Sequence, residues 1–400
     1  MNLKKISLVL AVCAAVSPAL GATPEARGLA MGGAYSPFAK GAEGLWYNPA
    51  TLGAITLAGV SVGVGADLNN NALTMMELQK LVSGSDADKY KSIDKIAKEG
   101  KWNANVDIDA GAGADVMGVG VGISQRAMVT GNDVTADTIE YSTFSTLDRP
   151  GVTRNVFDLN GTFQASSYRE IGVGYGRELP IPVPMAKISA GAVVKIYQGT
   201  KYTLMSTTNH VDKLVPANNT GNNVFADGTT GKGVGFDLGA HAEFAVVDAS
   251  LSIKNIASVI SWDTKVQGGK VDPATLTMSQ VNTTETIKQT LPMAIALGVG
   301  GHVPVVGTSV GMEIESVGKG TSKGDSDSIE TSGAETRLRI GAEQSVFGVL
   351  NFRAGYVTGG KGQVTLGLGL GALIARLDVG VGIGLDAKSG SAGLSGSVSF

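Results

Sequence analysis

Residues that could carry catalytic or metal-binding chemistry are few in this 400-residue chain and widely scattered. The three histidines, His210, His241 and His302, do not stand at the spacing of metal ligands. The glycine-rich stretch 119–122 alternates strictly with valine, and no Gly-Lys-Ser/Thr follows it as a nucleotide loop requires. The sequence therefore predicts no catalytic residue, no metal site and no cofactor.

Charged side chains instead alternate with large apolar ones at a period of two, as in strands that separate lipid from a polar lumen. A charge on the lipid face costs about 2–4 kcal/mol for Lys or Arg at mid-bilayer, which gives the segregation a physical cause. We predict that these residues face the lumen of a barrel: Asp237, His241, Glu243, Glu313, Glu315, Arg337, Arg339, Arg353, Arg376 and Asp378. A catalytic carboxylate pair such as Glu313 and Glu315 is the alternative, but the interleaved cations fit a salt-bridged, wetted interior better.

The end of the chain carries this pattern most clearly. Leu366, Leu368 and Leu370 alternate with glycines, and after one change of parity the alternation continues through 377–385. A tight turn produces such a parity change. The last strand ends on Phe400, and a terminal aromatic is how bacterial outer-membrane barrels usually finish.

About fourteen alternating segments can be recognised along the chain. They are roughly 55–66, 104–115, 116–127, 168–178, 185–198, 233–245, 247–256, 291–301, 303–316, 334–344, 347–357, 362–371, 373–385 and 391–400. Bacterial barrels have an even strand count, short periplasmic turns and long outer loops. Fourteen strands place the connections 67–103, 128–167, 199–232, 257–290 and 317–333 outside. The segment 156–166 is then part of an outer loop or extends the next strand, and sixteen strands, with one near 137–146, is the alternative.

The first fifty residues divide into two parts. Residues 1–22 have a basic start, an apolar stretch and a small-residue exit, which predicts a cleaved signal peptide for export. The only cysteine, Cys13, lies in this part, so the mature chain has no thiol; Val12 before it disfavours a lipoprotein signal. Residues 23–53 are rich in Gly and Ala and are the right size to plug a barrel, which would comprise residues 54–400. Within it, residues 72–99 have helical spacing and predict a helical outer loop.

The segments 26–35 and 41–52 resemble the opening of the FadL-type superfamily of outer-membrane barrels. This superfamily includes long-chain fatty acid transporters, PorV-like proteins of the type IX secretion system and a TraF-like branch. The residues that match its motif are Gly32, Gly33, Asn48, Pro49 and Ala50. The resemblance implies an all-β, antiparallel transmembrane barrel of fourteen strands, whose N-terminal segment enters the lumen as a hatch that these residues fold and seat.

Two functions follow from the resemblance. The first is passive uptake of hydrophobic, fatty-acid-like small molecules across the outer membrane, with release sideways into the lipid. The alternative is an accessory or shuttle subunit of a protein secretion or conjugal transfer system, so the expected partners are outer-membrane lipids and either a hydrophobic small molecule or a secretion-system protein. The net charge is −3, and the sequence has no basic patch interleaved with aromatic residues, so we do not expect the chain to bind nucleic acid.

Overall fold

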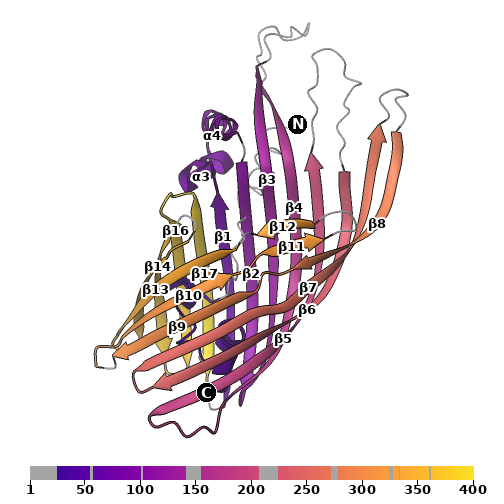
Figure 1. The fold of residues 1–400 in the computed structure, drawn as a ribbon. Coiled ribbons are helices and arrows are strands. Elements are labelled where there is room, and N and C mark those ends of the chain that lie inside the picture. The colour runs from indigo at the N-terminus through magenta and orange to yellow at the C-terminus, as the bar shows by residue number, and fades with distance from the viewer. Residues whose placement is uncertain are drawn as a thin grey trace.

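The computed structural model describes residues 25–54, 57–100, 102–140, 155–206, 224–271, 278–303, 305–323, 328–332, 334–359 and 362–400. The strands form one antiparallel sheet that closes on itself, because β1 pairs with both β2 and β17 (Figure 1). They are β1 (Ala58–Asn70), β2 (Trp102–Val116), β3 (Val119–Glu140), β4 (Asn155–Glu178), β5 (Ala186–Ser206), β6 (Val224–Phe244), β7 (Val247–Val271), β8 (Met278–Thr290), β9 (Ala294–Val303), β10 (Thr308–Val317), β11 (Gly320–Lys323), β12 (Ser328–Ser332), β13 (Glu335–Val346), β14 (Leu350–Val357), β15 (Gln363–Ala372), β16 (Ala375–Gly384) and β17 (Ser389–Ser399).

The barrel wall contains fourteen strands. Seventeen segments are present, but three pairs, β8 with β9, β10 with β11 and β12 with β13, each form one interrupted strand, and 17 − 3 = 14. The predicted fold and strand count are therefore confirmed. Residues 137–140 extend β3, and 156–166 belong to β4 rather than to a separate strand.

Three of the expected outer loops, 128–167, 199–232 and 257–290, begin and end in strand, which corrects the predicted connections. Pairing of β3 with β4 continues to Glu140 and Asn155, and pairing of β5 with β6 continues to Met205 and Val224. Residues 129–140 of β3 and 224–232 of β6 are rich in Thr, Asp and Gly and lack the apolar alternation that marks a wall strand, whereas Phe157, Leu159 and Phe163 of β4 do alternate with polar residues.

Side chains alternate between an apolar outer surface and a polar interior. On β2, Asp107 and Asp109 are 0% and 2% exposed, whereas Ile108 between them is 47% exposed. On β16, Asp378 is buried while Leu377 and Val379 are exposed. A face of exposed valine, leucine and isoleucine is what a lipid-facing barrel surface requires.

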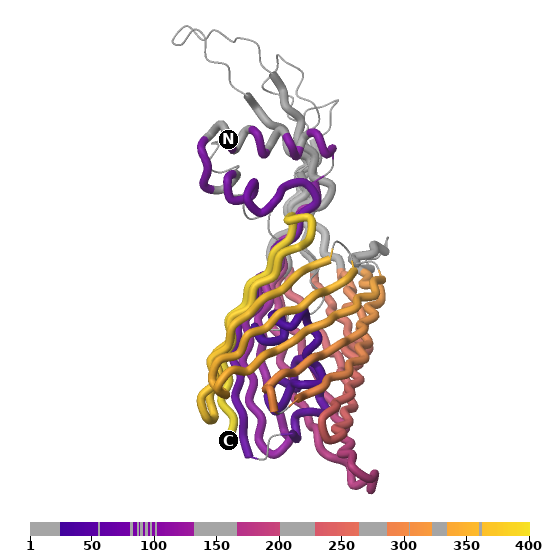
Figure 2. The backbone as a smooth tube through the Cα atoms, turned by 90° about the vertical axis from the view of Figure 1, so that its left-hand side faces the viewer, coloured from indigo at the N-terminus to yellow at the C-terminus, as the bar shows by residue number. Residues whose placement is uncertain are grey.

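The N-terminal segment lies inside the barrel, as the indigo tube in Figure 2 shows. It comprises α2 (Ala26–Ala30) and two 3-10 helices, η1 (Gly41–Leu45) and η2 (Pro49–Ala54). Its large side chains form a buried cluster of their own with one wall residue, Val193: Met31, Tyr35, Ala39, Leu45, Trp46, Tyr47 and Leu52. We call residues 25–54 the hatch.

The predicted helical segment forms two helices, α3 (Met75–Ser83) and α4 (Asp86–Glu99), at the end of the barrel away from the C-terminus (Figure 2). Thr74 begins α3 with a reciprocal capping box to Glu77. In the described part of the chain, no helix is long and apolar enough to cross a membrane.

Candidate functional site

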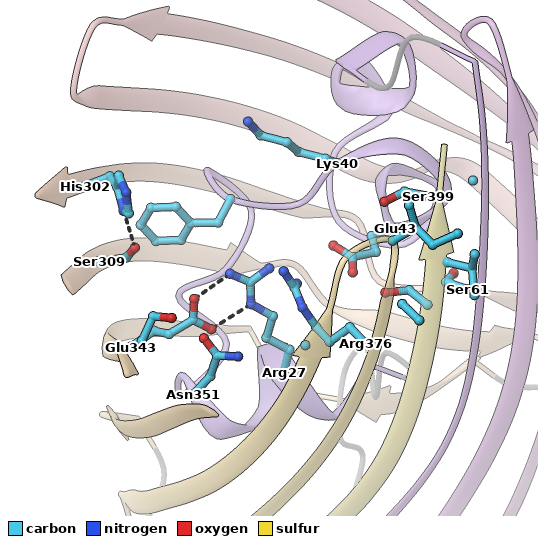
Figure 3. A pocket seen from close by; sticks show the side chains of 18 of the residues that line it. Arg27, Lys40, Glu43, Ser61, His302, Ser309, Glu343, Asn351, Arg376 and Ser399 are labelled. Carbon is cyan, nitrogen blue, oxygen red and sulfur yellow. Dashed lines mark hydrogen bonds and ion pairs between the residues drawn. The ribbon is translucent and has the colours of Figure 1, made fainter. Parts of the chain in front are cut away.

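A chain of buried ion pairs connects the hatch to the barrel wall, and Figure 3 shows its first pair, Arg27 with Glu343. Arg27 donates to Glu343 on β13 at 2.7 Å, and Glu343 also accepts from Arg353 on β14 at 2.5 Å. Arg353 continues to Asp378 on β16 at 2.7 Å. Arg27 also donates to the hydroxyl of Tyr35 at 2.8 Å. Arg27 is therefore bound to the wall through Glu343 and is not a solvated side chain. The network that it joins reaches three wall strands, β13, β14 and β16.

Further ion pairs line the same wall. Arg339 binds Glu313 at 3.0 Å and Glu315 at 2.5 Å. Lys195 binds Asp237 at 2.8 Å and Glu170 at 3.1 Å. The glutamates thus have cationic partners at short distance, which is the arrangement of a structural lattice and not of two free carboxylates.

All ten charges that the sequence assigned to the lumen lie on the inward face of the wall. Asp237, Glu313, Glu315, Arg353 and Asp378 are at most 4% exposed. The other five are His241, Glu243, Arg337, Arg339 and Arg376. The Nε2 atom of His241 lies 3.1 Å from the carbonyl oxygen of Pro37, so this side chain contacts the hatch.

Two hatch glycines sit directly against the wall. Gly32 and Gly33 have φ values of +64° and +81°, a backbone conformation that L side chains rarely adopt. A Cβ atom on Gly32 would lie 2.9 Å from the backbone nitrogen of Tyr356, and one on Gly355 would lie 2.3 Å from the nitrogen of Gly32. The close approach of hatch and wall backbones depends on glycine on both sides.

The Asn-Pro-Ala part of the motif makes a second contact with the wall. The Asn48 side chain accepts from the backbone N–H of Ala50 at 3.1 Å and donates to the carbonyl of Ala240 on β6 at 2.9 Å. The first bond closes an Asx turn. Wall glycines leave room for it, since a Cβ atom on Gly191 would lie 2.2 Å from the carbonyl oxygen of Pro49.

Polar cavities lie on both sides of the hatch. The larger one, of 610 Å³, opens at the end near the C-terminus and includes Arg27, Lys40, Glu43, His302 and Arg376 in its lining (Figure 3). The smaller one, of 150 Å³, lies on the other side and includes Glu25, Lys254 and Arg337. Burial, reinforced by the Glu43 carboxylate, raises the pKa of Glu25 well above its ordinary value. Among the described residues, no group of three His, Cys, Asp or Glu side chains could hold a metal ion.

An apolar cluster occupies the inner face of the wall on strands β4, β5, β7 and β8. Tyr197, Ile260 and Trp262 are at most 1% exposed, and Tyr168, Ile287 and Leu291 pack around them. The indole N–H of Trp262 donates to Gln289 at 2.9 Å, which satisfies its one polar atom. We call these six residues the lumen cluster. The cluster was not predicted from the sequence. The signal that could have revealed it is the presence of Trp and Tyr at positions of these strands that face the lumen.

The regular strand pairing is interrupted next to the lumen cluster, although the backbone N–H of Leu291 still donates to the carbonyl of Ser258 at 2.9 Å. β7 pairs with β9 from Val247 to Lys254 and with β8 from Val259 onward, so residues 255–258 face 291–293 outside the regular ladder. Asn255, with φ of +58°, donates from its side chain to the carbonyl of Pro292 at 3.1 Å and from its backbone to Asp237 at 2.7 Å. The ladder is irregular again between β10 and β11 at 318–319, where the backbone N–H of Gly318 donates to the carbonyl of Met293 at 2.8 Å. We call residues 255–258, 291–293 and 318–319 the seam.

Comparison with known proteins identifies the fold. No protein-family model matches the chain. No curated protein sequence matches it either. Among solved structures, the P. putida toluene transporter TodX superposes with a TM-score of 0.53 and 14% identity, covering 93% of this chain and 97% of that chain. The TodX deltaS2S3 mutant gives 0.56 with 13% identity over 94% and 97%.

The CymD monoaromatic hydrocarbon channel is similar at a TM-score of 0.53 and 13% identity, covering 96% of this chain and 98% of that chain. Likeness at this level of identity concerns the fold, over nearly the full length of both proteins. The expected fold is confirmed: the chain has the barrel fold of TodX and CymD, with fourteen strands in its own wall.

Proposed function

We propose that the chain is an outer-membrane channel for the passive uptake of hydrophobic small molecules. The lumen cluster carries this proposal, because it is a buried group of aromatic and aliphatic side chains on the inner face of an otherwise polar wall. Binding pockets for hydrophobic ligands are lined in this way, with few polar groups. TodX and CymD, which share the fold, are named a toluene transporter and a monoaromatic hydrocarbon channel.

The route follows from what lies beside the cluster. The hatch closes the lumen toward the end that bears the C-terminus, and its polar, salt-bridged surroundings are a poor path for an apolar molecule. The seam adjoins the lumen cluster through Leu291, which belongs to both. A ligand would therefore leave sideways through the seam into the membrane, with the hatch, including Gly32, Gly33, Asn48, Pro49 and Ala50, serving as a seal.

Initial uptake rates test the proposal. Cells that express the chain are given radiolabelled toluene or oleate, and entry is compared with cells that express Trp262→Ser. We expect this variant to lose most of the added uptake, because a hydroxyl replaces the largest apolar side chain of the cluster. The matched control is Tyr356→Ser, which also replaces an aromatic side chain by serine, but on the outer surface, where Tyr356 is 37% exposed.

The ligand class follows from the same assay. Preference for toluene over oleate would assign a monoaromatic ligand, and the reverse would assign a fatty-acid-like one. Equal rates with wild type, Trp262→Ser and no protein would contradict the uptake proposal.

One observation favours the alternative, an accessory subunit for secretion or conjugal transfer. The β3–β4 and β5–β6 pairs continue well past the wall, to Glu140 with Asn155 and to Met205 with Val224. Such polar hairpins suit a protein partner. Shortening them should leave hydrocarbon uptake unchanged under the first proposal and abolish secretion or transfer under the second.

A further inference from the structure

A row of basic and polar side chains crosses the outer surface of strands β4 to β8. Its members are register partners on successive strands: Arg169 pairs with Gln198, Gln198 with Lys232, Lys232 with Ser261, and Ser261 with Lys288. Arg169, Gln198, Lys232 and Lys288 are exposed and Ser261 is half-buried. We call these five residues the basic row. Adjacent strands lie about 4.8 Å apart, so its three cations follow one another at about 10 Å.

The basic row marks the edge of the apolar surface on these strands. On each strand, the next outward-facing residue toward the C-terminal end of the barrel is apolar: Ile171, Ile196, Val234 and Val259. The next outward-facing residues in the opposite direction are polar: Ser167, Thr200, Thr230 and Asp263. The outer face therefore changes from apolar to polar at the row, on the side of the barrel where the hairpins project.

Two apolar grooves of the outer surface reach this edge. One, of 510 Å³, is lined by Ile196, Val234 and Val259 and ends at Gln198, Lys232 and Ser261. The other, of 630 Å³, runs over small residues of β1, β2 and β17, including Gly63, Ala110 and Gly396, and has Arg169 and Gln125 at its rim. Each groove thus combines an apolar floor with a cation of the basic row.

The charge of the row defines the chemistry of its ligand. Within the described part of the chain, Arg169, Lys232 and Lys288 form no ion pair. The nearest outward carboxylate is Asp263, two residues beyond Ser261, and it leaves the region with a net charge of +2. Cations at the boundary of a bilayer attract anionic lipid head groups. A molecule that joins phosphates to acyl chains would match both the row and the grooves.

We infer that the basic row binds the phosphate groups of lipopolysaccharide in the outer leaflet, with acyl chains of the same lipid in the two grooves. The inference rests on the outer-membrane location within the proposed function, but not on which molecule passes through the lumen. It assigns a specific lipid contact to one side of the barrel, the side that carries the seam.

Native mass spectrometry tests the inference. The mature protein in zwitterionic detergent is titrated with purified deep-rough lipopolysaccharide, and wild type is compared with the R169Q/K232Q/K288Q variant. Each basic residue near an anionic lipid surface contributes about fivefold in affinity, so the triple variant should bind ~100-fold more weakly. Asp263→Asn should tighten binding about fivefold, because it removes the one negative charge beside the row.

Controls separate this site from general attraction. The K80Q/K91Q/K98Q variant removes the same charge from exposed positions on α3 and α4 and should bind as wild type does. Dephosphorylated lipopolysaccharide should bind wild type and triple variant equally weakly. Heat-modified migration in gels shows that each variant is folded. Equal affinity of wild type and triple variant, or equally strong binding of phosphatidylglycerol, would overturn the inference; a failed uptake assay would not affect it.

Discussion

At the scale of single residues, Glu343 holds the hatch and the wall together. Its carboxylate lies between the guanidinium groups of Arg27 and Arg353, and all three side chains are at most 12% exposed. A buried ion pair adds little stability compared with an apolar pair, but removing one partner leaves an uncompensated buried charge. The network therefore fixes the position of the hatch more than it strengthens the barrel.

Replacing Glu343 with Gln should loosen the hatch. Arg353 then keeps its pair with Asp378, but Arg27 loses its ion pair with the wall, and breaking a buried pair costs about 3–5 kcal/mol. We expect the variant to show frequent ion-conducting openings in planar bilayers, where wild type stays closed. Glu178→Gln, at an exposed position, is the control. A variant as closed as wild type would show that the ion pair is not needed to seat the hatch.

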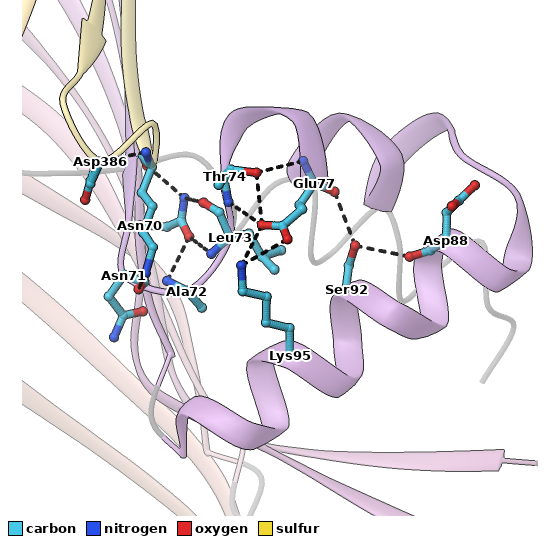
Figure 4. Close-up of polar contacts among 11 residues, drawn as sticks. Asn70, Asn71, Ala72, Leu73, Thr74, Glu77, Asp88, Ser92, Lys95 and Asp386 are labelled. Atoms are coloured by element: carbon cyan, nitrogen blue, oxygen red, sulfur yellow. Dashed lines mark hydrogen bonds and ion pairs between the residues drawn. The ribbon is translucent and has the colours of Figure 1, made fainter.

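At the scale of elements, the α3–α4 pair depends on one carboxylate (Figure 4). Glu77 accepts from the backbone N–H of Thr74 at 2.7 Å and from Lys95 on α4 at 2.9 Å. Burial alone would raise the pKa of Glu77, but the hydrogen bonds from Lys95 and Thr74 outweigh it and lower that pKa below its ordinary value of 4.5. Glu77 therefore favours the folded helix pair above pH 4.5, and this contribution disappears as the pH falls through the lowered value.

Hydrogen exchange measures that effect. After correction for intrinsic rates, amides of residues 77–83 should be less protected at pH 3 than at pH 7, whereas Glu77→Gln should be equally protected at both. Glu99→Gln, on an exposed end of α4, should behave as wild type. Constant protection in wild type would refute the role of Glu77 in holding the two helices.

The wall strands could be predicted from sequence because lipid on one side and water or hatch on the other force a period of two. Residues 362–400 follow this rule, and β15, β16 and β17 form there. The extension of β4 over 156–166 was one of the predicted alternatives, but the extensions of β3 and β6 were not predicted, since Thr, Asp and Gly replace the apolar alternation there. Asn255 and Pro292 do interrupt the apolar pattern, yet only the pairing of β7 with both β8 and β9 shows that they meet in one seam.

At the scale of the whole molecule, the two ends of the lumen differ in character. The hatch fills one end and is held there by ion pairs and close backbone contacts, whereas the buried lumen cluster and the irregular pairing of the seam lie further out. Under the proposed function, lateral release would not require the hatch to move, whereas passage straight through the barrel would. A covalent lock on the hatch distinguishes these two routes.

Cysteines at positions 26 and 393 provide that lock. A Cβ atom on Gly393 would lie 3.5 Å from the Cβ of Ala26, which is within disulfide range. Because Cys13 is the only native cysteine and lies in the predicted signal peptide, the A26C/G393C pair would have no competing thiol once that segment is removed. We expect the oxidised variant to take up toluene or oleate as fast as its reduced form, because release through the seam leaves the hatch in place. Single cysteine variants control for the substitutions, and uptake that stops on oxidation and returns with dithiothreitol would instead establish a route past the hatch.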